Sequence, residues 1–548
     1  MRPLHPLHPQ RNARVTPPEY PPRVGKRTAS IRKPMRGRFA MRRGFLRAIF
    51  GIEVLSAVAV FAVADAAAAQ PVETKVRASD AALGDRFGVS LAITGDYAVI
   101  GAQADDDLGG DAGAAYIWDV PSRTQIRKLH AADGAGGDYF GCAVAAFGDR
   151  AAFGALRDDH AATDAGSAYV FDVTDGTQIH KLVASDAAVD DWFGNAVAIS
   201  STYVLVGAYK YNHSTSIYDS GAAYLFDAAT GEQVRMLTAS DYGKQDWYGL
   251  AVAVSDEYAA VGAPTWDGGG TGHSNCGAVY VYDVATGAEL WRLTTTDQGA
   301  EDRFGNALAI QGNYLLAGAY WDTNIGASDA GAAYLFDLTT GQQVFEFLAS
   351  EPSGGGDWYG SSVAMSGNYA IIGANQQGND HEGFACVVDL ATGAELEMLT
   401  ASDGALDDEF GNSVAIRGAV ALVGSDMDDD NGVNSGSSYF YDPVTPSTGV
   451  ADAAPLARLA PRNRPNPFNP ATEISFTLPS AASVRLGVYD VSGRLLRTLF
   501  SGDRLGAGEV RATWDGFDGN GEPVPSGVYF LRVEAGDQQV SRKMTLVR

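Results

Sequence analysis

The chain is poor in cysteine and offers no pair of neighbouring cysteines. Its 548 residues include only three cysteines, Cys142, Cys276 and Cys386, which lie far apart in the sequence. Spacing this wide argues against a disulfide framework and against a cysteine-based metal cluster. We expect Cys386 to be a small apolar core residue.

Basic residues and long apolar runs are also scarce outside the first 70 residues. The chain has 40 Lys and Arg against 66 Asp and Glu, a net charge of −26, although residues 1–70 are themselves basic. The strongly acidic remainder argues against nucleic acid or an anionic membrane as a partner, because both attract clustered positive charge. The apolar run at about 48–64 contains Glu53 and is followed by Asp65, so it is too short to favour a transmembrane span.

Residues 1–70 have the pattern of a basic tail followed by a secretory signal. Residues 1–40 are rich in Pro and Arg and have no apolar periodicity, so we expect them to be disordered. From Met41 onward, Arg42-Arg43, the apolar run and the small residues 66–69 follow in the order of a signal peptide. We predict export to the extracellular space or the outer-membrane surface, with Met41 as a hypothetical true start.

The most informative feature is a segment that recurs seven times with a period of 51–56 residues. Each unit has a Phe-Gly or Tyr-Gly pair, a second glycine 13 residues later, and a Gly-x-x-Tyr-x-x-Asp run, with Cys386 in the tyrosine slot of unit 6. The glycines of the pairs are Gly88, Gly141, Gly194, Gly249, Gly305, Gly360 and Gly411. Such a repeat indicates a supersecondary unit that buries its apolar face only against its neighbours.

The pattern predicts four short strands in each unit. In unit 1 the apolar runs between turn residues lie at about 87–93, 97–102, 114–118 and 124–130. Four-stranded antiparallel units in one array are typical of β-propeller blades. We therefore predict an all-β chain with a seven-bladed β-propeller over residues 71–443.

The ends of the array predict a closed ring. Unit 7 has three strands through Tyr441 and then meets Pro443 and Pro446, which cannot donate hydrogen bonds to a strand ladder. At the other end of the array, residues 73–80 are similar to the fourth strand and turn at 180–186. We predict that this N-terminal strand completes blade 7 and leaves no open edge.

The Phe-Gly, Gly-Ala and Gly-Ala-x-Tyr elements resemble the FG-GAP repeat of integrin α-subunit propellers and of many bacterial surface proteins. The resemblance covers about residues 72–443 and implies a propeller that binds ligands outside the cell. The integrin-type repeat usually carries a calcium loop between its Phe-Gly and Gly-Ala elements, whereas this chain has only tight turns there, such as 94–96. We therefore do not expect calcium at the usual position of the family.

Length variation predicts that the functional loops lie on one face of the disc. Only the connection between the second and third strands varies much, and it emerges on the same face as the connection between units. In unit 7 this loop holds Asp426, Asp428 and Asp430, which alternate like calcium ligands. Unit 1 adjoins unit 7 in a closed ring, so Asp105 and Asp107 join them as candidate Ca²⁺ ligands. The alternative is a solvated acidic loop.

The same face carries aromatic side chains. Four of them directly precede a Phe/Tyr-Gly pair: Tyr139, Trp192, Trp247 and Trp358. Three more lie in connections between second and third strands: Trp266, Tyr320 and Trp321. Exposed rings stack on sugars or anchor a protein partner, whereas rings packed between blades belong to the core. The tryptophans and Tyr320 are our candidate ligand-binding residues, and both interpretations stay open.

A second domain follows the propeller. Residues 444–464 are rich in Pro, Ala and Arg and are predicted to be a linker, and the short alternating strands of 465–548 favour a small Ig-like β-sandwich. The Asn466-Pro467-Phe468, Val488-Tyr489-Asp490 and Ser526-Gly527-Val528-Tyr529 elements resemble the FlgD-type Ig-like domain that serves as the C-terminal sorting domain of type IX secretion cargo. The resemblance implies that residues 465–548 contact secretion machinery and attach the chain to the cell surface.

These patterns together predict a secreted or surface-displayed binding and adhesion protein whose propeller recognises a protein or carbohydrate ligand. Because the chain has no nucleophile elbow, His-Glu-x-x-His motif or P-loop, no catalytic residue is assigned. The alternative is an extracellular enzyme, either a polysaccharide hydrolase or lyase, or a quinoprotein, since residues 280–291 are similar to quinoprotein-type propeller repeats. The seven units and the lack of adjacent cysteines argue against the quinoprotein.

Overall fold

The computed structural model describes most of the chain beyond residue 70. The described ranges are 71–268, 274–323, 328–350, 355–376, 382–444, 462–464, 468–478, 482–490, 494–506, 508–519, 521–535 and 538–548. The predicted tail and signal, residues 1–70, lie outside these ranges. All secondary-structure elements of the described residues are β-strands. Accordingly, a search of these residues finds no helix long and apolar enough to cross a membrane.

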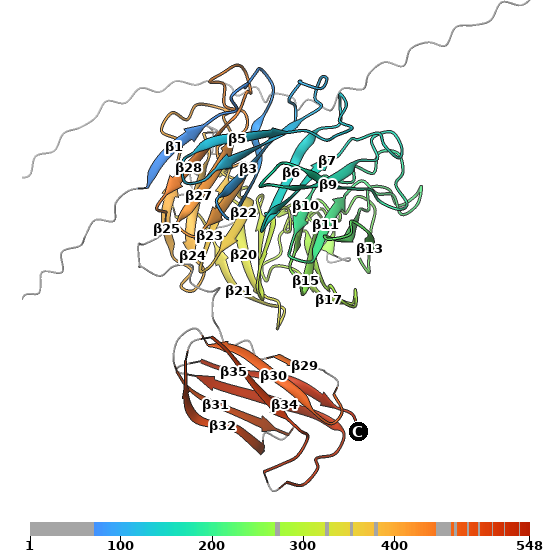
Figure 1. Cartoon of the computed structure of the whole chain (residues 1–548), viewed down its shortest axis with the longest axis vertical. Coiled ribbons are helices and arrows are strands. Elements are labelled where there is room, and N and C mark those ends of the chain that lie inside the picture. The colour runs from blue at the N-terminus through green and yellow to red at the C-terminus, as the bar shows by residue number, and fades with distance from the viewer. Residues whose placement is uncertain are drawn as a thin grey trace, which may run out of the picture. The chain divides into compact units, whose positions relative to one another are not determined.

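Seven antiparallel sheets of four strands each form the blades of the propeller (Figure 1). Blade 1 comprises β2 (Phe87–Thr94), β3 (Tyr97–Ala102), β4 (Ala114–Asp119) and β5 (Thr124–Leu129), and blade 2 comprises β6 (Phe140–Phe147), β7 (Arg150–Ala155), β8 (Ser167–Asp172) and β9 (Gln178–Leu182). Blade 3 comprises β10 (Val197–Ile199), β11 (Tyr203–Ala208), β12 (Ala222–Asp227) and β13 (Gln233–Leu237). The four strands predicted for unit 1 are confirmed to within one residue at each end.

The remaining blades repeat this order. Blade 4 comprises β14 (Val252–Val254), β15 (Tyr258–Ala263), β16 (Ala278–Asp283) and β17 (Glu289–Leu293), and blade 5 comprises β18 (Leu308–Gln311), β19 (Tyr314–Ala319), β20 (Ala332–Asp337) and β21 (Gln342–Phe347). Blade 6 comprises β22 (Tyr359–Ser366), β23 (Tyr369–Ala374), β24 (Phe384–Asp389) and β25 (Glu395–Leu399). Blade 7 comprises β26 (Val414–Arg417), β27 (Val420–Ser425), β28 (Ser437–Asp442) and, from the other end of the domain, β1 (Val72–Val76).

The N-terminal strand completes blade 7, as predicted. β1 pairs antiparallel with β28, with Val72 opposite Asp442 and Val76 opposite Ser438. In Figure 1 the blue β1 lies beside the orange β28. The innermost strands contact one another in order from β2 to β26, and β26 and β27 contact β2 again. The ring of blades is therefore closed, and the strand that closes it comes from the beginning of the domain.

The repeated glycines let neighbouring blades meet backbone to backbone. A Cβ built on Gly101 would lie 2.1 Å from the carbonyl oxygen of Gly141, the glycine of the next Phe-Gly pair. Gly113 has a φ of +83°, and a Cβ on it would lie 2.2 Å from the carbonyl oxygen of Phe140. Any side chain at these two positions would push the blades apart, and Gly113 also needs a left-handed backbone. The blade interface thus explains why these glycines recur.

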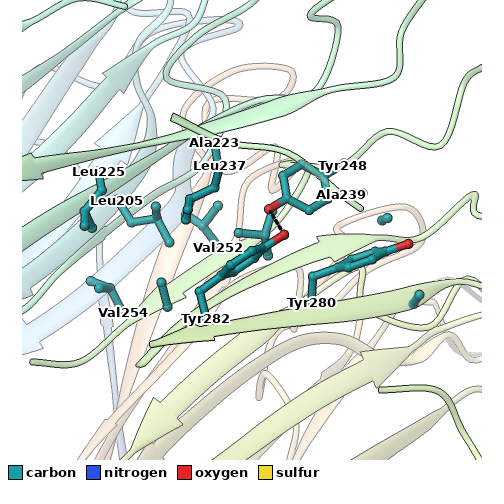
Figure 2. Packing of buried hydrophobic residues seen from close by; sticks show 14 of the residues in the cluster. Leu205, Ala223, Leu225, Leu237, Ala239, Tyr248, Val252, Val254, Tyr280 and Tyr282 are labelled. Carbon is teal, nitrogen blue, oxygen red and sulfur yellow. Dashed lines mark hydrogen bonds between the residues drawn. The ribbon is translucent and has the colours of Figure 1, made fainter. Parts of the chain in front are cut away.

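Aromatic rings fill the core of the blades. The ring of Phe87, from the first Phe-Gly pair, is fully buried and meets Tyr116 edge-on, with the centroids 5.4 Å apart. Figure 2 shows the corresponding packing around blades 3 and 4, where the hydroxyl of Tyr248 donates a hydrogen bond of 2.9 Å to that of Tyr282. Cys386 takes the place of the tyrosine in blade 6 and is fully buried, as predicted. All three cysteines are free thiols.

A small β-sandwich forms the C-terminal domain. One sheet consists of β29 (Arg462–Arg464), β30 (Thr472–Leu478) and β33 (Gly508–Trp514), and the other of β31 (Ala482–Tyr489), β32 (Leu495–Leu505), β34 (Gly527–Ala535) and β35 (Gln538–Leu546). Trp514, Ile474 and Leu531 are fully buried in its core. β29 lies at the end of segment 444–464, which we predicted to be a linker. Its backbone pairs with β30, so residues 462–464 belong to the sandwich. Most of that segment, 445–461, lies outside the described residues.

Candidate binding site on the loop face

One residue in each blade has a left-handed backbone directly before the Phe/Tyr-Gly pair. These residues are Arg86, Tyr139, Trp192, Trp247, Arg303, Trp358 and Glu409, with φ between 54° and 60°. The backbone amide of Trp247, for example, donates a hydrogen bond of 3.2 Å to the carbonyl oxygen of Asp219 in the preceding blade. This conformation costs a residue with a Cβ about 1 kcal/mol or more. Because every blade adopts it, seven side chains stand at equivalent points around the ring.

Seven aromatic side chains at these points and at neighbouring strand ends line blades 2 to 6. We call this group the aromatic arc: Tyr139, Trp192, Tyr209, Trp247, Tyr320, Trp321 and Trp358, all half-buried. The ring centroid of Tyr209 lies 5.6 Å from that of Trp192 and 5.9 Å from that of Trp247. In blades 5 and 6, Trp358 lies 5.6 Å from Tyr320. Each tryptophan therefore presents part of its surface while its neighbours fix its orientation.

Three cations join the arc. The guanidinium carbon of Arg157 lies 4.8 Å from the ring centroid of Trp192, and the Nζ atom of Lys210 lies 3.5 Å from the same ring. The guanidinium carbon of Arg303 lies 4.0 Å from the ring centroid of Trp321. Both arginines contact a second ring of the arc as well. Contacts of this kind contribute about 0.5–2 kcal/mol each, and here they link rings of neighbouring blades.

Five of the six aromatic residues predicted to bind a ligand belong to the arc: Trp192, Trp247, Trp358, Tyr320 and Trp321. Trp266 is placed differently, because it is only 5% exposed and packs in the core of blades 3 and 4. Sequence reasoning missed Tyr209 and the three cations. An alignment of the repeats could have found Arg157 and Lys210, because both stand, like Trp321, two residues after the alanine of Gly-Ala.

The candidate calcium ligands of blade 7 are bound by basic side chains. The Nζ atom of Lys75 lies 2.7 Å from Oδ2 of Asp428 and 2.6 Å from Oδ2 of Asp430. Asp426 is fully buried and takes part in a separate ion pair, 3.0 Å from Nη2 of Arg86. The three aspartates that alternate in the sequence are thus divided between two ion-pair clusters.

The candidate ligands of blade 1 have the same arrangement. The Nζ atom of Lys128 lies 2.7 Å from Asp105, 2.6 Å from Asp107 and 2.8 Å from Asp80. The carboxylate oxygens of these aspartates lie within 4.8 Å of one another, close enough to share one cation, and the lysine ammonium group supplies that charge. The hydroxyl of Tyr116 also donates to Asp80 and Asp105, at 3.0 and 2.9 Å.

Electrostatics favour the charged lysine in this cluster. Burial lowers the pKa of Lys128, but its hydrogen bonds to the three aspartates outweigh burial and raise the pKa above its ordinary value. Burial together with the neighbouring carboxylates raises the pKa of Tyr116 far above its ordinary value, so the hydroxyl remains a donor. Blade 2 repeats the pattern, with Lys181 bound to Asp133 and Asp158.

Blade 5 has the same tyrosine and aspartates around a different residue. The hydroxyl of Tyr334 donates to Asp322 at 2.5 Å and to Asp297 at 3.4 Å. Glu346 is paired with Tyr334 in the strand register, at the place that Lys128 holds in blade 1. Burial raises the pKa of Asp322 to about 7, with a further contribution from nearby carboxylates that include Glu346. This cluster therefore accumulates negative charge where the lysine-containing blades balance it.

The shared interfaces, clusters and left-handed positions are properties of one repeated module. The family model described as FG-GAP repeat matches the chain seven times, at residues 72–118, 124–171, 177–226, 232–282, 288–336, 343–387 and 394–441. The chain belongs to the FG-GAP repeat family. Each FG-GAP match begins with an outermost strand and ends with the third strand of the following sheet, so β1 belongs to the first repeat in sequence and to blade 7 in space. The model of the FlgD Ig-like domain matches residues 464–539. A search of curated proteins finds no significant match.

Proposed function

We propose that this FG-GAP protein is a secreted or surface-displayed binding and adhesion protein that recognises an extracellular glycan through the aromatic arc. FG-GAP repeats are typical of extracellular proteins, and the FlgD Ig-like domain fits that setting. The arc carries the proposal, because half-buried rings held in fixed orientations across five blades suit stacking on successive sugar rings. The C-terminal domain is proposed to direct export and surface attachment.

A glycan array probed with the chain from residue 71 onward tests this function. Replacing Trp192 and Trp321 together by alanine should reduce binding by about 30-fold or more, the loss expected when anchoring aromatics are removed. The matched control is Phe147→Ala, because Phe147 is 50% exposed but ends β6 at the opposite face of the disc. Equal binding by the double variant and the control would contradict the proposal. Binding to arrayed proteins and to no glycan would instead assign the protein-ligand class.

One observation favours an enzyme as the second candidate. Burial raises the pKa of Glu409 to about 7, and repulsion from the fully buried Asp426 adds to the effect. A polysaccharide hydrolase uses one carboxyl group with a raised pKa as general acid and a second, ionised carboxylate as base or nucleophile. Glu409 would be the acid, and Asp426, paired with Arg86, the carboxylate. Release of reducing ends or unsaturated products from bound glycans, abolished in Glu409→Gln, would establish that activity. Intact glycans after prolonged incubation would support a binding role alone.

A further inference from the structure

We propose that the aromatic arc takes an acidic polysaccharide, one whose sugar rings carry carboxylate or sulfate groups. The inference rests on the proposed glycan-binding function and narrows the ligand to a charge class. It starts from the three cations of the arc, Arg157, Lys210 and Arg303, rather than from its aromatic rings.

These cations are not neutralised by ion pairs. None of the three forms an ion pair with any described residue, although the chain has 66 acidic side chains against 40 basic ones. The lysines in the acidic clusters of blades 7 and 1 are fully paired, because Lys75 and Lys128 each bind three aspartates. Five other described cations of the propeller also form no ion pair: Arg127, Arg150, Arg235, Lys244 and Arg417. What distinguishes the arc is that Arg157 and Arg303 each contact two aromatic rings.

The arc also holds its arginines ready for an anion. The guanidinium carbon of Arg157 lies 5.1 Å from the ring centroid of Tyr139 and 4.8 Å from that of Trp192. That of Arg303 lies 5.7 Å from Trp247 and 4.0 Å from Trp321. The Nε atoms of both arginines are buried without a hydrogen-bond partner. A guanidinium group fixed by aromatic rings keeps planar donors that suit the two oxygens of a carboxylate or sulfate.

The cations stand at two positions along the arc, Arg157 and Lys210 at Trp192, and Arg303 between Trp247 and Trp321. Following the blades from 2 to 6, the order is Tyr139, Arg157, Trp192, Lys210 and Tyr209, Trp247, Arg303, Tyr320 and Trp321, and Trp358. A polysaccharide with an acidic substituent on its repeating sugar has the complementary order of apolar sugar faces and anionic groups. Two separate cationic positions among the rings favour a polymer over a single small anion, which would use only the position at Trp192 or the one at Trp321.

Carboxylates near the arc reduce its positive charge, among them Asp111, which acts on Tyr139 together with Arg157. Burial raises the pKa of Asp164, an effect that the charge of Arg157 partly offsets, and Lys210 acts in the same way on Asp219. These carboxylates therefore limit how strongly the arc attracts anions, which suits a ligand that also stacks on the rings.

The test uses polymers that differ only in charge. The chain from residue 71 onward is titrated with polygalacturonate and with its fully methyl-esterified form, and separately with dextran sulfate and dextran. We expect at least one acidic polymer to bind about tenfold or more tightly than its uncharged counterpart at low salt. The difference should shrink as added salt screens the charges. Preference in the first pair assigns a carboxylate as the anion, and preference in the second assigns a sulfate.

Variants link the preference to the three cations. The triple variant R157Q/K210Q/R303Q should lose the preference for the acidic polymer, whereas the control Arg417→Gln, on an exposed residue at the end of β26, should keep it. Equal binding of the acidic polymers and their uncharged counterparts by the unmodified chain would overturn the inference while leaving glycan binding intact. Because that comparison needs no variant, it stays decisive even if the triple variant unfolds. Binding to no polymer, combined with a negative glycan array, would overturn the proposed function too.

Discussion

The Nζ atom of Lys75 lies 2.7 Å from Oδ2 of Asp428, although the two residues are 353 positions apart in the chain. Lys75 stands on β1, and Asp428 stands in the loop that follows β27. The same ammonium group lies 2.8 Å from Asp403, in the turn that leads into blade 7. The first strand of the propeller is therefore fixed to the last blade by backbone pairing and by ion pairs.

Removal of β1 should open the ring. Deleting residues 72–76 leaves β28 as a bare edge strand, which is a template for pairing with other chains. We expect a marked loss of thermal stability and the appearance of oligomers in size-exclusion chromatography. Lys75→Met keeps the ladder and removes only the ion pairs, so it should cost less, about 2 kcal/mol in the free energy of unfolding. A deletion variant that remains monomeric with an unchanged melting temperature would contradict the closure.

The ammonium group of Lys128 neutralises three aspartates that a bound calcium ion could neutralise instead. Lys128→Gln removes the positive charge and leaves Asp80, Asp105 and Asp107 close enough to share one cation. We expect the variant to be destabilised in chelator and to regain about 2.7 kcal/mol when free Ca²⁺ exceeds its dissociation constant a hundredfold. Calorimetric scans with calcium and with chelator measure this gain.

A variant in blade 2 provides the control for the calcium experiment. Lys181 is bound to only two aspartates, so Lys181→Gln should show a smaller calcium-dependent gain, because Ca²⁺ favours six to eight oxygen ligands. A Lys128→Gln variant whose melting temperature is the same in calcium and in chelator would show that the aspartates cannot replace the ammonium group by a metal.

The acidic cluster of blade 5 should make stability depend on pH. The folded pKa of Asp322 is raised to about 7 from 3.8, so the folded state binds a proton that the unfolded state releases. This contribution to stability is present below about pH 4 and is lost as the pH rises to about 7. Asp322→Asn should therefore remove part of the destabilisation seen between pH 5 and pH 8 in urea unfolding. An identical pH profile for the variant would contradict the assignment.

A second variant tests the cause of that dependence. Glu346→Lys restores the lysine that Lys128 provides in blade 1, so it should favour the charged form of Asp322 and raise the free energy of unfolding at pH 8 by about 1 kcal/mol. The gain should shrink at pH 5, where Asp322 is largely protonated. A gain of the same size at both pH values would indicate a cause other than this cluster.

The fold could be predicted from the sequence because its constraints are local and repeated. Gly101 and Gly113 recur since a side chain at either position would meet the next blade, so the period of the glycines is the period of the blades. The missing strand of unit 7 could be predicted because Pro443 ends the pattern where the other units continue. The start of the sandwich could not be predicted, because β29 is only three residues long and carries no strand pattern.

The binding site could be predicted only in part, because side chains alternate between two sides of an extended chain. Trp321 lies two residues after the alanine of Gly-Ala and joins the arc, whereas Trp266 lies three residues after it and is buried. That third position is the one that Asp105 occupies in blade 1. In blade 4, Arg292 takes the place of Lys128, and its guanidinium carbon lies 4.9 Å from the ring centroid of Trp266. A cation–π contact thus stands where Lys128 pairs with Asp105, while Arg292 keeps an ion pair with Asp241.

The C-terminal domain has a core of its own. Its buried cluster contains only residues between Phe468 and Leu546, with Trp514 fully enclosed. The sandwich also shares no repeat with the propeller, and the FlgD Ig-like match begins only after the last FG-GAP repeat. A domain that buries its own apolar surface can fold alone. We therefore predict that a chain ending at residue 444 still folds and binds its ligand.

Experiments on this truncated form should separate ligand binding by the propeller from export by the C-terminal domain. Limited proteolysis within residues 445–461 should release two stable fragments, because each retains its own core. In a host with the matching secretion system, the truncated chain should accumulate in the periplasm while the full chain reaches the surface. Display of the truncated chain at the surface would contradict the sorting role, and its failure to fold would contradict the independence of the domains. Because glycan binding is measured separately in vitro, a defect in export leaves the assignment of the aromatic arc unaffected.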